Sequence, residues 1–183
     1  MEAPKIGMVM LAAAAAACAG APAPKTAETT AYYYGEVSAF SPDGRLPYNK
    51  TESAVKRQVL EGGALVRETT TVPGIAPSMP PTETILELRR RGRSLAYGVS
   101  GSGGASGTVR FASPELKAWT CEVRLKDGGS LTGSGEIRPD GMRSRKTLSG
   151  VARPMAVGED LKPVTESEYR MRLYEMLPRR GAE

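Results

Sequence analysis

The sequence contains no histidine and only two cysteines among its 183 residues. Histidine is the commonest general base and the commonest metal ligand in proteins, so its absence counts against the enzymes and metal centres that depend on it. Ser53 and Lys56 match an S-x-x-K pattern of serine nucleophiles, but the S-D-N and K-T-G patterns that accompany it are missing. We therefore expect a protein that is not an enzyme and that uses no metal or cofactor.

Large aromatic side chains are also scarce, with two Phe and one Trp, whereas glycine is frequent at 21 residues. Short strands joined by many turns would explain this balance. The formal net charge of +5 favours anionic partners only weakly, and the sequence has no basic arm that would indicate nucleic acid binding. One folded domain is the expectation at this length.

The apolar run over residues 6–17 is too short to span a bilayer and follows a short start that contains Lys5. Residues 1–17 therefore fit a signal peptide. The small residues Ala15-Ala16-Ala17 directly precede Cys18, and this arrangement resembles the lipobox of bacterial lipoprotein precursors. The resemblance implies that Cys18 is acylated and becomes the mature N-terminus. A plain secretory signal with an incidental cysteine is the alternative.

Residues 18–30 are rich in Ala, Pro and Thr and have no apolar period, which is typical of an extended tether. Residues 31–183 then form the single folded domain. With an acylated Cys18, the protein would lie on the periplasmic face of a bacterial membrane, with the outer membrane favoured. The membrane would be its partner through this anchor.

The clearest β pattern surrounds Asp127-Gly128-Gly129. Apolar residues occupy odd positions on both sides, from Trp119 to Leu125 and from Leu131 to Ile137. Paired positions in an antiparallel hairpin have a constant sum, so two odd-numbered apolar faces coincide only when that sum is even. The pattern predicts a three-residue turn over 127–129, with Leu125 opposite Leu131 and Trp119 opposite Ile137.

Two glycines interrupt the apolar face of the second strand of this hairpin. Glycine in a strand interior packs nothing and needs a physical reason. A tryptophan ring lying diagonally over Gly135, or a sharp bend that closes a barrel, is the favoured reason, and space for a ligand is the alternative. Cys121 has no histidine partner and is expected to be a buried, unpaired thiol. The candidate interior or ligand-binding residues are Trp119, Cys121, Val123, Gly133 and Gly135.

A second hairpin turns at Gly62-Gly63. This turn pairs Leu60 with Leu65 and Arg57 with Glu68. An apolar residue then lies opposite an apolar residue, and a positive charge lies opposite a negative one.

A third hairpin turns at Arg91-Gly92, which places Leu86 opposite Tyr97 and Leu88 opposite Leu95. Four arginines then crowd its end, and we call them the arginine tip: Arg89, Arg90, Arg91 and Arg93. Their charges make the tip a candidate contact for an anionic membrane surface. Solvated charges that protect a strand end are an equally good interpretation.

The segment Thr165-Glu166-Ser167-Glu168 is a capping box, which predicts the start of a helix. Apolar residues follow at helical spacing from Tyr169 to Leu177, and Pro178 ends the helix. So short a helix is marginal in water, so it must dock on the sheet.

These elements predict a mainly β fold with eight or nine antiparallel strands and one C-terminal helix over about 165–177. A meander with one apolar face must close or curl to bury that face. We expect a calycin-like barrel with the helix against its wall, or else a strongly curved sheet. In strand count and terminal helix the domain resembles a lipocalin, although the G-x-W motif of that family is missing.

Two functions fit this description. The first is a lipid-anchored, non-catalytic envelope protein that binds an apolar or amphiphilic ligand inside the barrel. The second is a structural or protein-interaction lipoprotein with a filled core and no small-molecule ligand. Tightly packed side chains at Trp119, Val123 and Leu125 would favour the second function.

Replacing Cys18 by alanine should release the protein from the membrane fraction, because no other residue of the predicted signal can be acylated through a thiol. Fractionation of wild type and Cys18→Ala measures this directly. Retention of the variant in membranes, together with an N-terminal peptide of unmodified mass in the wild type, would contradict lipidation.

Overall fold

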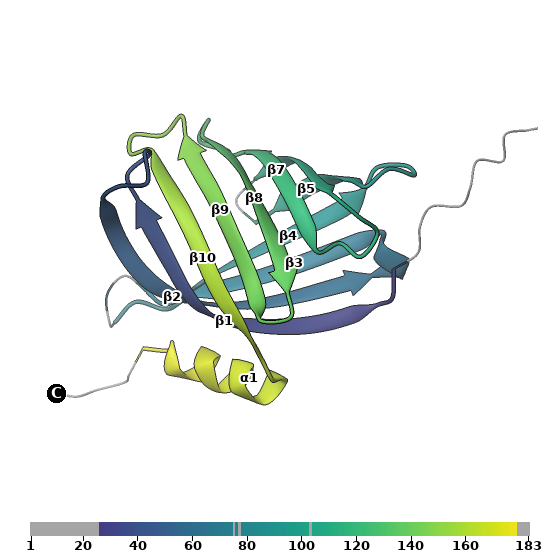
Figure 1. The fold of residues 1–183 in the computed structure, drawn as a ribbon. Coiled ribbons are helices and arrows are strands. Elements are labelled where there is room, and N and C mark those ends of the chain that lie inside the picture. The colour runs from purple at the N-terminus through teal and green to yellow at the C-terminus, as the bar shows by residue number, and fades with distance from the viewer. Residues whose placement is uncertain (1–25, 75, 77, 103, 179–183) are drawn as a thin grey trace, which may run out of the picture.

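A computed structural model describes residues 26–74, 76, 78–102 and 104–178 (Figure 1). The signal peptide and Cys18 lie outside these residues. The described chain forms ten strands and a C-terminal α-helix: β1 (Thr29–Phe40), β2 (Pro47–Leu60), β3 (Leu65–Val72), β4 (Thr82–Arg90), β5 (Ala96–Gly101), β6 (Ser106–Phe111), β7 (Ala118–Arg124), β8 (Ser130–Arg138), β9 (Gly141–Ser149), β10 (Met155–Val164) and α1 (Glu166–Glu175).

The ten strands form a closed barrel in which each strand pairs antiparallel with its neighbours in the sequence. The ring is completed by β1 and β10, which pair over nine consecutive positions from Tyr32–Val164 to Phe40–Ala156. Closure leaves no free edge among the strands that the structure describes. The predicted barrel is therefore confirmed, with ten strands instead of eight or nine.

The barrel also begins earlier than the predicted tether allows. Thr29 already pairs with Val59, and the amide of Thr26 donates to the carbonyl of Gly62 at 2.9 Å. The last residues of the predicted tether therefore belong to the folded domain. The pattern-based boundary was wrong here because threonine suits a strand as well as a tether.

The β2–β3 hairpin has the predicted register, with Leu60 opposite Leu65 and Arg57 opposite Glu68. A short 3-10 turn over Glu61–Gly63 joins the strands. Gly62 and Gly63 have φ values of 61° and 84°, a left-handed conformation that glycine adopts without steric cost.

In the β7–β8 hairpin the numbers of paired residues still add to an even sum, as predicted. The predicted partners are wrong, because each β7 residue lies opposite the β8 residue two positions before the predicted one. Trp119 lies opposite Gly135, and Val123 lies opposite Leu131. The loop is Lys126-Asp127-Gly128, because Gly128 takes the left-handed position (φ 89°) while the Asp127 carboxylate accepts from the Gly129 amide at 3.1 Å. The glycine in the left-handed position sets the register of the hairpin. The sequence has two adjacent candidates for it, Gly128 and Gly129, and the structure uses Gly128.

The predicted two-residue turn between β4 and β5 is wrong. Leu88 lies opposite Val99, and Arg90 lies opposite Tyr97. A wider loop joins the strands, closed by the Arg91 amide, which donates to the carbonyl of Ala96 at 2.9 Å. The apolar face of each strand is unchanged, but the longer loop lets Tyr97 reach into the barrel, where it is fully buried.

Helix α1 lies against the outer wall of the barrel beside β1 and β2 (Figure 1). The predicted capping box is present: the Glu168 amide donates to the Thr165 hydroxyl at 3.2 Å, and the Thr165 amide donates to the Glu168 carboxylate at 2.8 Å. Tyr169 and Met176 bury the helix against Ala54, which is fully inaccessible to solvent. The predicted docking of the helix on the sheet is confirmed.

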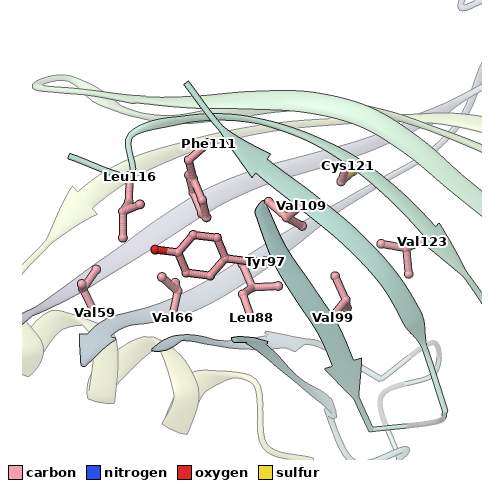
Figure 2. Packing of buried hydrophobic residues seen from close by; sticks show 10 residues of the cluster. All are labelled: Val59, Val66, Leu88, Tyr97, Val99, Val109, Phe111, Leu116, Cys121 and Val123. Atoms are coloured by element: carbon pink, nitrogen blue, oxygen red, sulfur yellow. The ribbon is translucent and has the colours of Figure 1, made fainter. Parts of the chain in front are cut away.

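One end of the barrel is filled by its largest side chains, and we call it the plugged end. Segment 112–117 folds over it and inserts Leu116, which is fully buried. The rings of Tyr97 and Phe111 meet edge to face there, with centroids 5.0 Å apart. Figure 2 shows the residues that gather around Tyr97: Val59, Val66, Leu88, Val99, Val109, Phe111, Leu116, Cys121 and Val123.

Candidate functional site

All five residues predicted for the interior face the inside of the barrel on β7 and β8. Cys121 and Val123 are buried, with 6% and 7% of their surface exposed, and Trp119 packs against the same core. Cys121 lies opposite Gly133 and Trp119 lies opposite Gly135. Trp119 and Cys121 on β7 therefore each face a glycine on β8, whereas Val123 faces Leu131.

Gly133 and Gly135 lack a side chain for different steric reasons. A Cβ atom on Gly135 would lie 2.7 Å from Cε2 of the Trp119 indole, so this ring occupies the place of a side chain. A Cβ atom on Gly133 would lie 2.7 Å from Cα of Lys146 on β9, so there the neighbouring backbone comes too close. The ring covers its glycine directly, where a diagonal contact was predicted, and neither glycine leaves open space.

A cavity among the central interior side chains has a volume of about 70 Å³. A second and more open pocket of about 390 Å³ lies at the plugged end, where Tyr33, Arg57 and Ile137 face Pro114. The walls of the central cavity combine apolar side chains, among them Leu88 and Val99, with the polar groups of Glu68, Lys146 and Glu159. An engineered cavity that binds benzene in another protein has a volume of about 150 Å³. The central cavity is therefore too small for an acyl chain unless the side chains around it move.

An ion pair that the sequence analysis missed borders this cavity. The Lys146 ammonium lies 2.8 Å from a carboxylate oxygen of Glu159, and the Ser144 hydroxyl donates to the same oxygen. Their side chains are 24% and 13% exposed. Lys146 and Glu159 lie on the inward-facing positions of β9 and β10, so the alternation of β9 could have indicated that a lysine points inward.

Burial and charge act against each other in this pair. Burial lowers the pKa of Lys146, but attraction by Glu159, aided by Glu68, outweighs it and raises the pKa. Burial raises the pKa of Glu159, but Lys146 and the Ser144 hydroxyl together outweigh it and lower the pKa. Both groups are therefore charged at neutral pH.

A second interior ion pair joins β2 to β3. The Arg57 guanidinium lies 3.0 Å from a carboxylate oxygen of Glu68, and the arginine is only 6% exposed. Arg57 also donates to the carbonyl of Leu116 at 2.8 Å. The pairing of Arg57 with Glu68 was predicted from the hairpin, but its inward direction was missed. This arginine ties the segment over the plugged end to the barrel wall.

The interior groups are poorly suited to nucleophilic catalysis. Burial raises the pKa of the Cys121 thiol, and the raised pKa of Lys146 keeps its amine protonated. Within the described ranges, no cluster of three potential metal-binding side chains occurs, and Cys121 forms no disulfide. Cys18 lies outside the described residues.

The arginine tip is dispersed in the folded barrel. Arg90 turns inward, where it donates to the Tyr97 hydroxyl at 2.9 Å and to the carbonyl of Gly63 at 2.8 Å. Arg89 pairs with Glu61 of the neighbouring hairpin at 3.4 Å. Arg91 and Arg93 are exposed. The guanidinium groups of Arg89, Arg91 and Arg93 therefore lie at the surface, and the charge of Arg89 is neutralised by Glu61.

The comparisons with family models, curated proteins and solved structures find no match for this chain. In the part of the chain that the structure describes, no helix has the length and apolarity needed to cross a membrane. The candidate site therefore has to be interpreted from its own chemistry.

Replacing Gly135 by valine should lower the free energy of unfolding by about 1–3 kcal/mol, because the new side chain collides with the Trp119 indole. Gly158→Val on β10 is the matched control, since a Cβ atom there meets only Phe40, at 3.7 Å. Urea denaturation measures both variants. Equal stability of Gly135→Val and the control would contradict the covering role of Trp119.

Replacing Lys146 by methionine should destabilise the barrel at neutral pH by up to about 3 kcal/mol, because Glu159 loses its partner in a largely buried place. The Lys146→Met/Glu159→Gln double variant should recover much of this loss. The difference between the two variants should shrink on acidification, because the unpaired Glu159 becomes neutral. In the wild type the contribution of Glu159 is complete above about pH 4.3, the unfolded pKa, and is lost as the pH falls through the lower folded pKa.

Urea denaturation at pH 5 and pH 7 tests this pair. Arg143→Gln is the control, because its ion pairs with Asp140 and Asp160 are exposed and their loss should leave the stability almost unchanged. A Lys146→Met protein as stable as the control at pH 7 would contradict the assignment.

Proposed function

We propose that this protein is a lipid-anchored, non-catalytic bacterial envelope protein that acts through its outer surface, with a barrel filled for stability. The observation that carries the proposal is the central interior cavity of about 70 Å³, which is about half the volume of a cavity that binds benzene in another protein. The proposal corresponds to the second of the two functions considered from the sequence.

The charged groups of the interior support this proposal because they already have partners. Glu159 accepts from both Lys146 and Ser144, and Arg57 is held by Glu68 and by the carbonyl of Leu116. A charged ligand would have to displace one of these contacts, and an apolar ligand would have to displace packed side chains. The interior shows no new contact that would make up for either loss.

The position of the N-terminal segment is compatible with an anchor. Thr26 lies at the plugged end, where its hydroxyl donates to the carbonyl of Pro114 at 2.5 Å. Cys18 precedes Thr26 by eight residues, which span at most about 28 Å when extended. An acylated Cys18 would hold the plugged end toward the membrane and leave the opposite end and the side wall accessible.

An amphiphile-binding barrel is the second candidate. Apolar side chains from several strands line the cavity, and the Lys146 ammonium at its edge could attract an acidic head group. This function would require the barrel to expand around Trp119 and Phe111.

Native mass spectrometry of the purified full chain should detect the protein with its covalent acyl groups and no bound small molecule. Denaturing mass spectrometry of the same sample is the control, because covalent acyl groups persist and a bound ligand is lost. A molecule present only in the native spectrum, and lost in Lys146→Met, would overturn the filled-core function in favour of the amphiphile-binding barrel.

A further inference from the structure

A concave surface lies on the outer wall of the barrel, across β6 to β9. It is a groove of about 620 Å³, which we call the outer groove. Its outward-facing polar side chains are Arg110, Thr120, Ser134, Glu136, Arg143 and Arg145, and the inward-facing positions Phe111, Trp119, Gly135 and Ser144 also border it. The interior and the arginine tip share none of the outward-facing polar groups, so the groove is a separate feature.

Four of these residues form one row across four adjacent strands. Arg110 lies opposite Thr120, Thr120 opposite Ser134, and Ser134 opposite Arg145. All four are exposed on the outward-facing positions of their strands. Neighbouring strands are about 4.8 Å apart, so the two arginine backbones are separated by about 14 Å. Two short hydroxyl side chains therefore lie between two long cationic ones.

The charges of the groove are unbalanced at these two arginines. Arg143 is neutralised by Asp140 at 2.9 Å and Asp160 at 3.5 Å, which also raise its pKa. Within the described residues, no hydrogen bond or ion pair engages the guanidinium of Arg110 or of Arg145.

The acids near this row leave both guanidinium groups unpaired. Glu136 is paired with Arg138 at 2.7 Å. Glu122 lies one row away on β7, and no ion pair in the described part of the chain joins it to either arginine. Arg110 and Arg145 are thus without an acidic partner, and the Arg145 guanidinium extends toward Gly44 in the loop between β1 and β2.

We propose that the outer groove binds a linear polysaccharide that carries carboxylate groups. The two guanidinium groups would each pair with a carboxylate, and their separation suits a ligand with repeated charges better than one small anion. Thr120, Ser134 and the free lone pairs of Glu136 would hydrogen-bond sugar hydroxyls between them. The inference rests on the proposed function only in assigning activity to the outer surface.

The shape of the site favours a chain over a membrane. A bilayer surface reaches protruding residues, whereas Thr120 and Ser134 are short and lie between longer side chains in a hollow. A strand of sugars can enter such a groove and contact both hydroxyls and both arginines at once. The hydroxyls of Thr120 and Ser134 can both donate to and accept from the hydroxyls of an acidic sugar chain, whereas the side chains of polyglutamate offer carboxylates alone.

Isothermal titration of the purified full chain with oligogalacturonate tests the proposal at low and high salt. We expect saturable binding that weakens with salt and a loss of at least about tenfold in affinity in Arg110→Gln/Arg145→Gln. Arg93→Gln/Arg124→Gln is the matched control: it removes the same charge from exposed positions outside the groove and should change affinity by less than about twofold.

A third variant, Ser134→Phe, keeps every charge and fills the groove, and aromatic residues are well tolerated in strands. It should weaken binding as strongly as the double arginine variant. Circular dichroism and thermal unfolding show that each variant is folded, so that loss of binding can be assigned to the site.

Three results would overturn the proposal. The first is no binding of oligogalacturonate by the wild type, or an equal loss in the groove and control variants. The second is equal affinity for polyglutamate of similar length, which would show an attraction to charge alone. The third is binding only to phosphatidylglycerol vesicles, which would make the wall a membrane contact. A ligand found inside the barrel would refute the filled core and leave this test unaffected.

Discussion

Closure of the barrel by β1 and β10 is the constraint on which the rest of the structure depends. Each strand carries apolar residues on alternate positions, and a sheet with one such face must cover it. Pairing the first strand with the last removes both edges and encloses the inward-facing apolar residues, while α1 covers the apolar patch on the outer wall of β1 and β2. The first and last strands are far apart in the chain, so the pairing that closes the ring is a long-range contact, which is slow to form in folding.

The closed ring has to be filled, and the chain does so with few large side chains. Tyr97, Phe111 and Leu116 occupy the plugged end, and Trp119 covers Gly135 further along. Charged residues complete the filling, with Arg57 paired to Glu68 and Lys146 paired to Glu159. Interior ion pairs add little net stability compared with apolar packing, but each one is costly to break from one side. They therefore select one arrangement of the barrel interior.

The central cavity of only about 70 Å³ directs attention to the outer wall. The outer wall carries two contrasting surfaces: α1, which covers β1 and β2, and the groove across β6 to β9. The first has its apolar contacts satisfied by Tyr169 and Met176. The second has two arginines without partners in the described chain, separated by hydroxyl groups. Unpaired charge around a hollow is the feature of this molecule that is most directly explained by a ligand.

The sequence by itself determined the β class, the inward and outward alternation, the β2–β3 register and the capping box of α1. These features depend on neighbours in the chain: a period of two, a glycine pair that adopts positive φ, and a threonine three residues before a glutamate.

Only the tertiary structure decided the rest. The β4–β5 loop is longer than its Arg-Gly signal suggested, because Tyr97 gains a buried place and a hydrogen-bonded partner in Arg90 when the strands slide. The inward ion pairs and the row from Arg110 to Arg145 need strands distant in the sequence to stand side by side. The positions of these residues follow from the closure and the register of the whole barrel. A pattern in one stretch of sequence does not determine either of them.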